Sequence, residues 1–281
     1  MPSSTTLRAR VVSALGEQLS STLLLRERAA PLTVPTGLAA LDSLTGGWPR
    51  GALSEINGPA SSGRTGVMLA ALAGATRREE ACALVDASDN FDPASGAAAG
   101  VDLDRLLWVR CGAPNCTSLR KDQRRGALGR LEQVLKVTDL LLQGGGFGMV
   151  VLDLGDIPTE SVRRIPLTSW FRFRRAVEPT ATVLLVVERE ACAKTCASLV
   201  VRLQRTAVCA RDSAATTHPK SQGWKVLGLE TSAISSIPSV NVVNHAALLR
   251  GLQLRAEVVR SWAQRKPMRS VGTNFELRAA W

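Results

Sequence analysis

Short apolar runs recur along the chain, separated by longer stretches in which apolar residues return every three or four positions. The short runs have the length of buried strands, and the longer stretches have the spacing of amphipathic helices. Glycine- and proline-rich segments lie between these elements and mark turns. Together they predict an α/β fold. The strands are expected at residues 52–57, 81–86, 107–110, 149–153, 183–187, 199–205 and 224–230.

Helical spacing also marks the two ends of the chain. Residues 7–28 carry apolar side chains four positions apart and predict an N-terminal helix, which needs a surface to dock on. Residues 244–265 are predicted to form another helix, followed by an extended basic segment. We therefore divide the chain into an N-terminal helical arm (residues 1–32), a core domain (residues 33–237) and a basic C-terminal tail (residues 238–281).

A glycine-framed turn follows the strand predicted at residues 52–57. Gly58, Gly63 and Thr65 have the G-x-x-x-x-G-x-[ST] spacing of a phosphate-binding loop, and an alanine- and leucine-rich helix follows. Such a loop surrounds phosphates with backbone N–H groups and the positive end of a helix. Arg64 replaces the lysine of such loops, and its wide planar fork is not equivalent to an ammonium. A plain strand–turn–helix, in which the glycines only make the turn, is the alternative.

Composition narrows the class of protein. Apolar residues make up 45% of the chain, as in globular proteins. No apolar run approaches the roughly 20 residues of a membrane span, and the N-terminus lacks the apolar core of a signal peptide. We therefore expect a cytoplasmic protein without membrane contact. The six cysteines form no CxxC pair and only two histidines are present, which favours free thiols in apolar gaps over a metal site.

The chain is strongly basic, with a net charge of +11 and a pI near 10.2. A charge of this sign and size favours an anionic partner, most commonly nucleic acid. A soluble protein that is basic without binding nucleic acid is the alternative, and composition alone leaves both open.

Residues 36–66, TGLAALDSLTGGWPRGALSEINGPASSGRTG, resemble the entry segment and phosphate loop of the RecA recombinase family. The resemblance implies a RecA-like P-loop core with a mostly parallel central sheet flanked by helices. It also implies that ATP and Mg²⁺ are the ligands to consider. Asp153, which ends an apolar strand, takes the position of the acidic residue near the magnesium. The nucleotide-binding residues implied are Gly58, Ser61, Ser62, Gly63, Arg64, Thr65 and Asp153.

The chain departs from the RecA pattern at several positions that serve ATP cleavage. Ser88 stands at the position of the family's catalytic glutamate and cannot act as a carboxylate base. Glu188 stands at the position of its nucleotide-sensing glutamine, where a negative charge would repel a γ-phosphate. Gly228 and Glu230 align with two lysines that reach a neighbouring subunit's nucleotide. We therefore expect a degenerate ATPase with no catalytic residue and no required cofactor.

The resemblance also indicates where DNA would bind. The family's first DNA-binding loop corresponds to the segment after Asp153, and Arg163 and Arg164 are the residues assigned to backbone phosphates. The second DNA loop is shortened to residues 189–197. Trp170 and Phe171 fall at helical spacing and are assigned to the core.

A RecA-like core with altered ATPase residues and a short C-terminal tail is similar to the ImuA family, accessory proteins of bacterial mutagenic repair. This implies a non-catalytic adaptor in the SOS response and translesion synthesis after DNA damage. Its partners would be an ImuB-like Y-family protein, the error-prone polymerase indirectly, and RecA or single-stranded DNA. Self-association stays open. The partner-binding residues assigned to the tail are Leu248, Leu252, Val259 and Trp262.

Two other functions remain open at this stage. One is an ATP-dependent DNA recombinase or repair ATPase in which Arg64 substitutes for lysine. The other is an inhibitor that caps RecA filaments. ATP hydrolysis would distinguish the first from an adaptor, and strand-exchange assays would distinguish the second.

Overall fold

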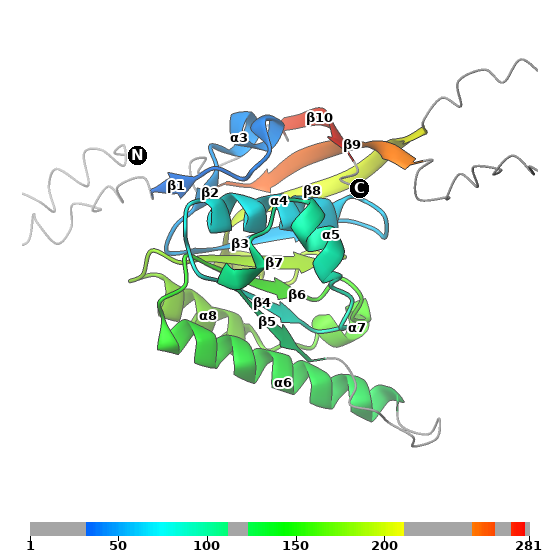
Figure 1. The fold of residues 1–281 in the computed structure, drawn as a ribbon. Helices are drawn as coiled ribbons and strands as arrows, with labels where there is room; N and C mark the ends of the chain where they lie inside the picture. The colour runs from blue at the N-terminus through cyan, green and yellow to red at the C-terminus, as the bar shows by residue number, and fades with distance from the viewer. Residues whose placement is uncertain (1–31, 112–122, 211–248, 262–270, 279–281) are drawn as a thin grey trace, which may run out of the picture.

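The computed structural model describes residues 32–111, 123–210, 249–261 and 271–278. Its core is an eight-stranded sheet with the order β10-β9-β8-β3-β7-β6-β4-β5 (Figure 1). The strands from β8 to β5 are parallel, whereas β9 and β10 are antiparallel additions at one edge. The strands are β3 (Ala52–Asn57), β4 (Cys82–Asp86), β5 (Leu106–Arg110), β6 (Met149–Asp153), β7 (Val183–Glu188), β8 (Ala197–Ala210), β9 (Leu249–Arg260) and β10 (Val271–Arg278).

Helices cover both faces of this sheet, as its parallel strands require. The remaining elements are β1 (Thr33–Val34), α3 (Ala39–Thr45), β2 (Trp48–Pro49), α4 (Arg64–Arg77), α5 (Pro93–Ala98), α6 (Gln123–Gly144), α7 (Thr159–Val162) and α8 (Leu167–Val177), with 3-10 turns at Leu103–Arg105 and Lys194–Cys196. The predicted α/β class and the mostly parallel sheet flanked by helices are confirmed.

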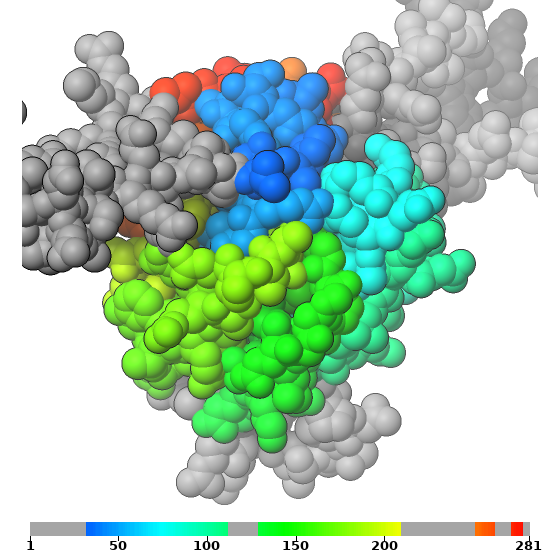
Figure 2. Space-filling view, turned by 90° about the vertical axis from the view of Figure 1, so that its left-hand side faces the viewer, coloured from blue at the N-terminus to red at the C-terminus, as the bar shows by residue number. Residues whose placement is uncertain are grey.

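Two separate apolar cores lie on the two faces. One joins α6, α7 and α8 to strand residues such as Leu53, Val186 and Val200. The other joins α3 and α4 to the opposite side chains of the same strands, such as Ile56 and Val187. Figure 2 shows the green α6–α8 layer below and α3, in blue, beside red β10 residues above. The alternation of side chains along each strand divides the two cores.

The C-terminal segment differs from the prediction. A helix over residues 244–265 is wrong, because residues 249–260 form β9, which pairs with β8. Leu254, Ala256 and Val258 recur every second position and are buried, whereas Arg255 between them is exposed. Strand β10 then pairs with β9. The residues assigned to a separate basic tail therefore supply two strands to the core sheet where the structure describes them.

Helix α8 also corrects one detail. Trp170 is buried as predicted, but Phe171 is 43% exposed and Phe173 takes the inner position instead. The two inner rings, Trp170 and Phe173, meet edge to face with centroids 5.9 Å apart. Phe173 lies three residues after Trp170, the spacing that brings side chains onto one helix face, whereas Phe171 does not.

Two predicted elements lie outside the described residues. They are the N-terminal helix at residues 7–28 and the strand at residues 224–230. Cys82, Cys111, Cys192 and Cys196 are free and buried in the apolar cores. Among the helices that the structure describes, none combines the length and the apolar character that a bilayer span requires.

Candidate functional site

The loop between β3 and α4 has the backbone shape of a phosphate cradle. Its residues Ser61 and Gly63 have positive φ angles of 59° and 85°, which turn successive N–H groups toward one side. Gly63 is the N-cap of α4, and no side chain caps that helix end. The Ser62 hydroxyl is buried without a hydrogen-bond partner in the described part of the chain. A ligand with phosphate oxygens would satisfy these donors.

Residues from the far end of the chain hold this loop in place. A Cβ atom on Gly63 would collide with the Leu254 side chain of β9, and one on Gly66 would collide with Leu277 of β10. Gly63 therefore meets two requirements, a left-handed backbone and close packing against Leu254. The sequence predicted the glycine but not the strand that lies against it.

Arg64 is directed to the floor of the site. Its side chain is buried, and both terminal nitrogens of the guanidinium donate to the Gly155 carbonyl at 3.4 Å. Burial lowers the pKa of the Arg64 guanidinium, and the carboxylates of Asp153 and Asp156 oppose this shift. The neighbouring Thr65 is exposed. The cation of the loop thus contacts the backbone after β6.

Asp153 lies beside Arg64, at the carboxyl end of β6. Its Oδ1 accepts a hydrogen bond of 2.9 Å from the Gly155 N–H. Burial raises the pKa of the Asp153 carboxyl to about 6, and the charges of Asp86 and Asp156 add to this rise. Asp86 is its neighbour in register on β4. The structure therefore brings Arg64 and Asp153 of the predicted set together beneath the loop.

The turn after β4 holds no free carboxylate at the catalytic position. Ser88 is there, and its N–H donates to Asp86 at 3.1 Å. The other Asp86 oxygen accepts from the Phe91 N–H at 2.9 Å and the Trp108 indole at 3.3 Å. Asp89 is paired with Arg110 at 2.6 Å. The carboxylates of this turn are thus engaged in shaping it.

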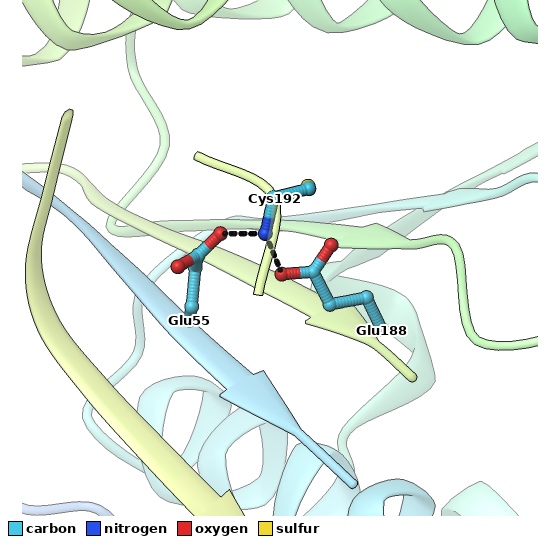
Figure 3. Close-up of side chains that lie close together, drawn as sticks. All are labelled: Glu55, Glu188 and Cys192. Atoms are coloured by element: carbon cyan, nitrogen blue, oxygen red, sulfur yellow. Dashed lines mark hydrogen bonds between the residues drawn. The ribbon is translucent and has the colours of Figure 1, made fainter. Parts of the chain in front are cut away.

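Glu188, which was expected to present a negative charge to a γ-phosphate, is buried in the structure. It is 1% exposed and lies beside Glu55, which is 0% exposed (Figure 3). The Cys192 N–H donates to both carboxyl groups, at 3.0 Å to Glu55 and 2.9 Å to Glu188, and the Ala193 N–H donates to Glu55 at 2.5 Å. Burial raises the pKa of the Glu188 carboxyl to about 9, and the charge of Glu55 adds to the rise.

The raised pKa favours the neutral form of Glu188 near pH 7, which weakens the repulsion of a γ-phosphate expected from the sequence. Its carboxyl group instead anchors the short connection that follows β7. The side chains of Glu55, Glu188 and Cys192 offer potential metal ligands within 4.8 Å of one another. The second oxygens of the two carboxyl groups, however, point away from each other (Figure 3). This arrangement suits a carboxyl–carboxylate pair clamped on backbone N–H groups.

The two arginines assigned to DNA have different surroundings. Arg163, just after α7, forms an exposed ion pair with Glu190 at 2.5 Å. Arg164 is exposed and makes no ion pair with the residues that the structure describes. Arg164 is therefore the more available of the two for a phosphate.

Of the four residues assigned to partner binding, the two that the structure describes lie on opposite faces of one strand. Leu248 and Trp262 lie outside the described residues. Leu252 and Val259 are seven positions apart on strand β9, so their side chains point to opposite faces of the sheet. Val259 is 37% exposed, whereas Leu252 is half-buried on the α4 side. The helix that was expected to present these residues is thus replaced by a strand where the structure describes them.

Sequence reasoning missed the pairing of Glu55 with Glu188 and the support of the loop by Leu254. The first has a partial sequence signal, since Glu55 lies within a predicted strand and Glu188 directly follows another. The second had only a weak one, the alternation of apolar residues in β9.

Comparison with known proteins agrees with this geometry. The model of the RecA N-terminal domain family matches residues 16–158. The chain is 38% identical to protein RecA of Lactobacillus acidophilus over 123 residues, 43% of this chain and 29% of that protein. It is 37% identical to protein RecA of Clavibacter michiganensis over 129 residues, 45% of this chain and 31% of that protein.

A third relative, protein RecA of Symbiobacterium thermophilum, is 37% identical over 141 residues, 50% of this chain and 33% of that protein. The match thus spans about a third of each relative's length. The family-model match, over residues 16–158, includes the phosphate loop, the turn after β4 and the end of β6. With the loop, the strand order and this match taken together, the chain belongs to the RecA N-terminal domain family.

Proposed function

We propose that this chain is a non-catalytic, ImuA-like adaptor in DNA-damage-induced translesion synthesis. It would bind an ImuB-like Y-family protein and, through it, an error-prone polymerase, with RecA and single-stranded DNA as further partners. The observation that carries the proposal is the position of Arg64. Its guanidinium is buried against the Gly155 carbonyl, so the loop keeps a phosphate cradle whose cation is engaged by the protein.

The carboxylates around the loop support the absence of hydrolysis. Phosphoryl transfer to water needs a group that orients the attacking water, together with cations that neutralise charge on the phosphates. Position 88 is a serine, Asp86 accepts hydrogen bonds from its own turn, and Asp89 is paired with Arg110. Each lost contact to the transition state costs a few kcal/mol, about 2.7–4 for one donor in well-studied enzymes. Together these losses favour a scaffold over a catalyst.

The backbone of the loop still fits a phosphate. Ser62, Gly63 and the first N–H groups of α4 would hold the phosphate oxygens, and Asp153 lies where a magnesium ion would be expected to neutralise charge. Bound ATP would supply binding energy for a particular conformation. On this proposal it would be retained without being cleaved.

A hydrolysis assay tests the catalytic half of the proposal. The full chain is incubated with ATP, Mg²⁺ and single-stranded DNA, and a RecA protein serves as the positive control. We expect phosphate release no faster than in a protein-free blank. Metal-dependent turnover that disappears in an Asp153→Asn variant would overturn the proposal. The double variant Arg64→Lys, Ser88→Glu measures whether the family's two groups alone restore turnover on this backbone.

A binding assay tests the adaptor half. The chain is mixed with an ImuB-like Y-family protein, with and without ATP, and complexes are separated by size-exclusion chromatography. We expect a complex whose yield does not depend on the nucleotide. Absence of a complex under both conditions would refute the adaptor role.

Membership of the RecA family favours one second candidate, an ATP-dependent recombinase or repair ATPase. In that case Arg64 would have to leave the Gly155 carbonyl when ATP binds and contact the phosphates. DNA-stimulated hydrolysis in the assay above would support this candidate, and its absence would leave the adaptor.

A further inference from the structure

Three adjacent strands carry a row of polar residues on the face opposite α4, at the level where β3 and β7 end. Asn57 of β3 is in register with Glu188 of β7 and with Arg202 of β8. Partners in register on parallel strands project to the same face of a sheet. Residues an even number of positions earlier, such as Leu53 and Val200, contact the α6–α8 core. This row therefore lies on the α8 side of the sheet, behind the phosphate loop.

A cavity of about 390 Å³ lies beside this row. Its lining includes Asn57, Arg189, Glu190, Arg202 and Gln204, together with the first residues of the phosphate loop. The arginines, Glu190 and Gln204 are exposed and form a polar rim, whereas Asn57 is buried in its floor. The cavity thus combines an accessible mouth with a buried polar group.

The buried group has an unmet hydrogen bond. Asn57 is 3% exposed, and its amide nitrogen Nδ2 has no hydrogen-bond partner among the described residues. A buried donor without a partner costs about 1–3 kcal/mol, so folded proteins rarely leave one unless a ligand, ion or water accepts from it. The required ligand atom is an acceptor.

The free charge around the cavity is positive. The Arg202 side chain makes no ion pair or hydrogen bond with the part of the chain that the structure describes, although Glu257 is its register partner on β9. Arg189 donates to the Gly155 carbonyl at 2.9 Å and lies 3.5 Å from Asp156. The one acidic residue of the lining, Glu190, is already paired with Arg163. Burial and the charge of Glu55 raise the pKa of the Glu188 carboxyl, which favours its neutral form and weakens its opposition to an anion.

We propose that this cavity binds a phosphate group, which would accept a hydrogen bond from Asn57 Nδ2 and form an ion pair with Arg202. The phosphate is that of a free nucleotide or of a nucleic-acid backbone, two sources with the same chemistry. The site adjoins the cradle at the start of α4, since Gly58 and Pro59 line it, but Asn57 and Arg202 belong to the sheet. The proposal does not depend on the adaptor function proposed above. A guanidinium and an amide donor suit a phosphate, which offers several acceptor oxygens and negative charge.

Two probes test the site on the full chain. Binding of inorganic pyrophosphate is measured by titration calorimetry, and binding of a fluorescently labelled single-stranded oligonucleotide is measured by anisotropy. The test variant is Arg202→Gln. The matched control is Arg205→Gln, because Arg205 is on the same strand, is also exposed and unpaired among the described residues, and does not line the cavity.

We expect Arg202→Gln to weaken binding at least tenfold and Arg205→Gln to change it less than twofold. Equal losses in the two variants would indicate diffuse electrostatic attraction and overturn the proposal. No binding of either probe to the parent chain would also overturn it. Binding that survives Arg202→Gln but is lost in Ser62→Ala would place the phosphate in the cradle of the phosphate loop. That result would also overturn the proposal.

A second variant tests the amide independently. Asn57→Asp keeps the size of the side chain, removes the donor and adds a negative charge, so we expect binding to be lost while the melting temperature shows a folded protein. Unchanged binding in this variant would contradict the assignment. Two outcomes would support the proposal and distinguish the source of the phosphate. If Arg202→Gln weakens the binding of pyrophosphate but not of the oligonucleotide, the site is assigned to nucleotides. If it weakens the binding of both probes and the two compete with each other, the site is assigned to a nucleic-acid backbone.

Discussion

Replacement of Glu188 by glutamine should make the protein more stable at neutral and alkaline pH. The glutamine keeps the size and shape of the side chain, and its carbonyl oxygen can still accept the 2.9 Å hydrogen bond from the Cys192 N–H. What it removes is the ionisation. In the parent chain the carboxyl is buried beside Glu55, and its pKa is raised from 4.5 to about 9.

The sign follows from proton binding. Between pH 4.5 and about 9 the folded state keeps a proton on Glu188 that the unfolded state has lost. Stability therefore falls as pH rises through this window, by up to about 1.4 kcal/mol per pH unit. From pH 5 to pH 8 the upper bound is about 4 kcal/mol. Relaxation around a buried charge reduces such penalties, so we expect about 2 kcal/mol.

Chemical denaturation at a series of pH values measures this effect. We expect the parent and Glu188→Gln curves to meet near pH 5 and to separate as pH rises, with the variant more stable. Glu190→Gln is the matched control, because Glu190 forms an exposed ion pair with Arg163 and should change stability by less than about 1 kcal/mol at any pH. Parallel curves for the parent and Glu188→Gln would refute the neutral state of Glu188.

Three further predictions concern the support of the phosphate loop. Gly63→Ala should destabilise the protein by about 1–3 kcal/mol because of its left-handed backbone and its contact with Leu254, whereas Gly129→Ala, in open space on α6, should stabilise it by about 0.5–1 kcal/mol; thermal unfolding compares them. Leu254→Ala should cost about 2–5 kcal/mol and speed hydrogen exchange at residues 58–66, and unchanged exchange there would contradict the support by β9. Deletion of residues 249–281 should prevent the core from folding, and a cooperative melting transition in the truncated chain would show otherwise.

The order of the core elements was accessible from sequence because each buried strand is a short apolar run between turn signals. The C-terminal strand β9 was not, since its apolar residues fit two periods. Leu248, Leu252 and Val259 fall at helical spacing, whereas Leu254, Ala256 and Val258 alternate as in a strand. Ala256 is too weakly apolar to make the alternation conspicuous. Pairing with β8 selects the strand over the helix, and the local sequence pattern alone cannot make this choice.

The sequence predicted the position of the phosphate loop in the candidate site. It did not predict the contacts of Arg64 or the protonation of Glu188. The spacing of Gly58, Gly63 and Thr65 located the loop correctly. The direction of the Arg64 side chain depends on the Gly155 carbonyl, which is far away in sequence. The neutral state of Glu188 depends on burial and on Glu55, which contacts the same connection. Tertiary neighbours determine both properties, so a single sequence position does not reveal them.

The contact of Leu254 with Gly63 has a consequence for biosynthesis. A ribosome makes the chain from its N-terminus, so the phosphate loop emerges long before the strand that packs against it. Until residues 254 and 277 are available, the nascent chain exposes the apolar side of β8 and a loop without its final support. Such intermediates expose unpaired strand edges and are prone to aggregate. We therefore expect the support of the loop to be completed late in folding, after most of the chain has been made.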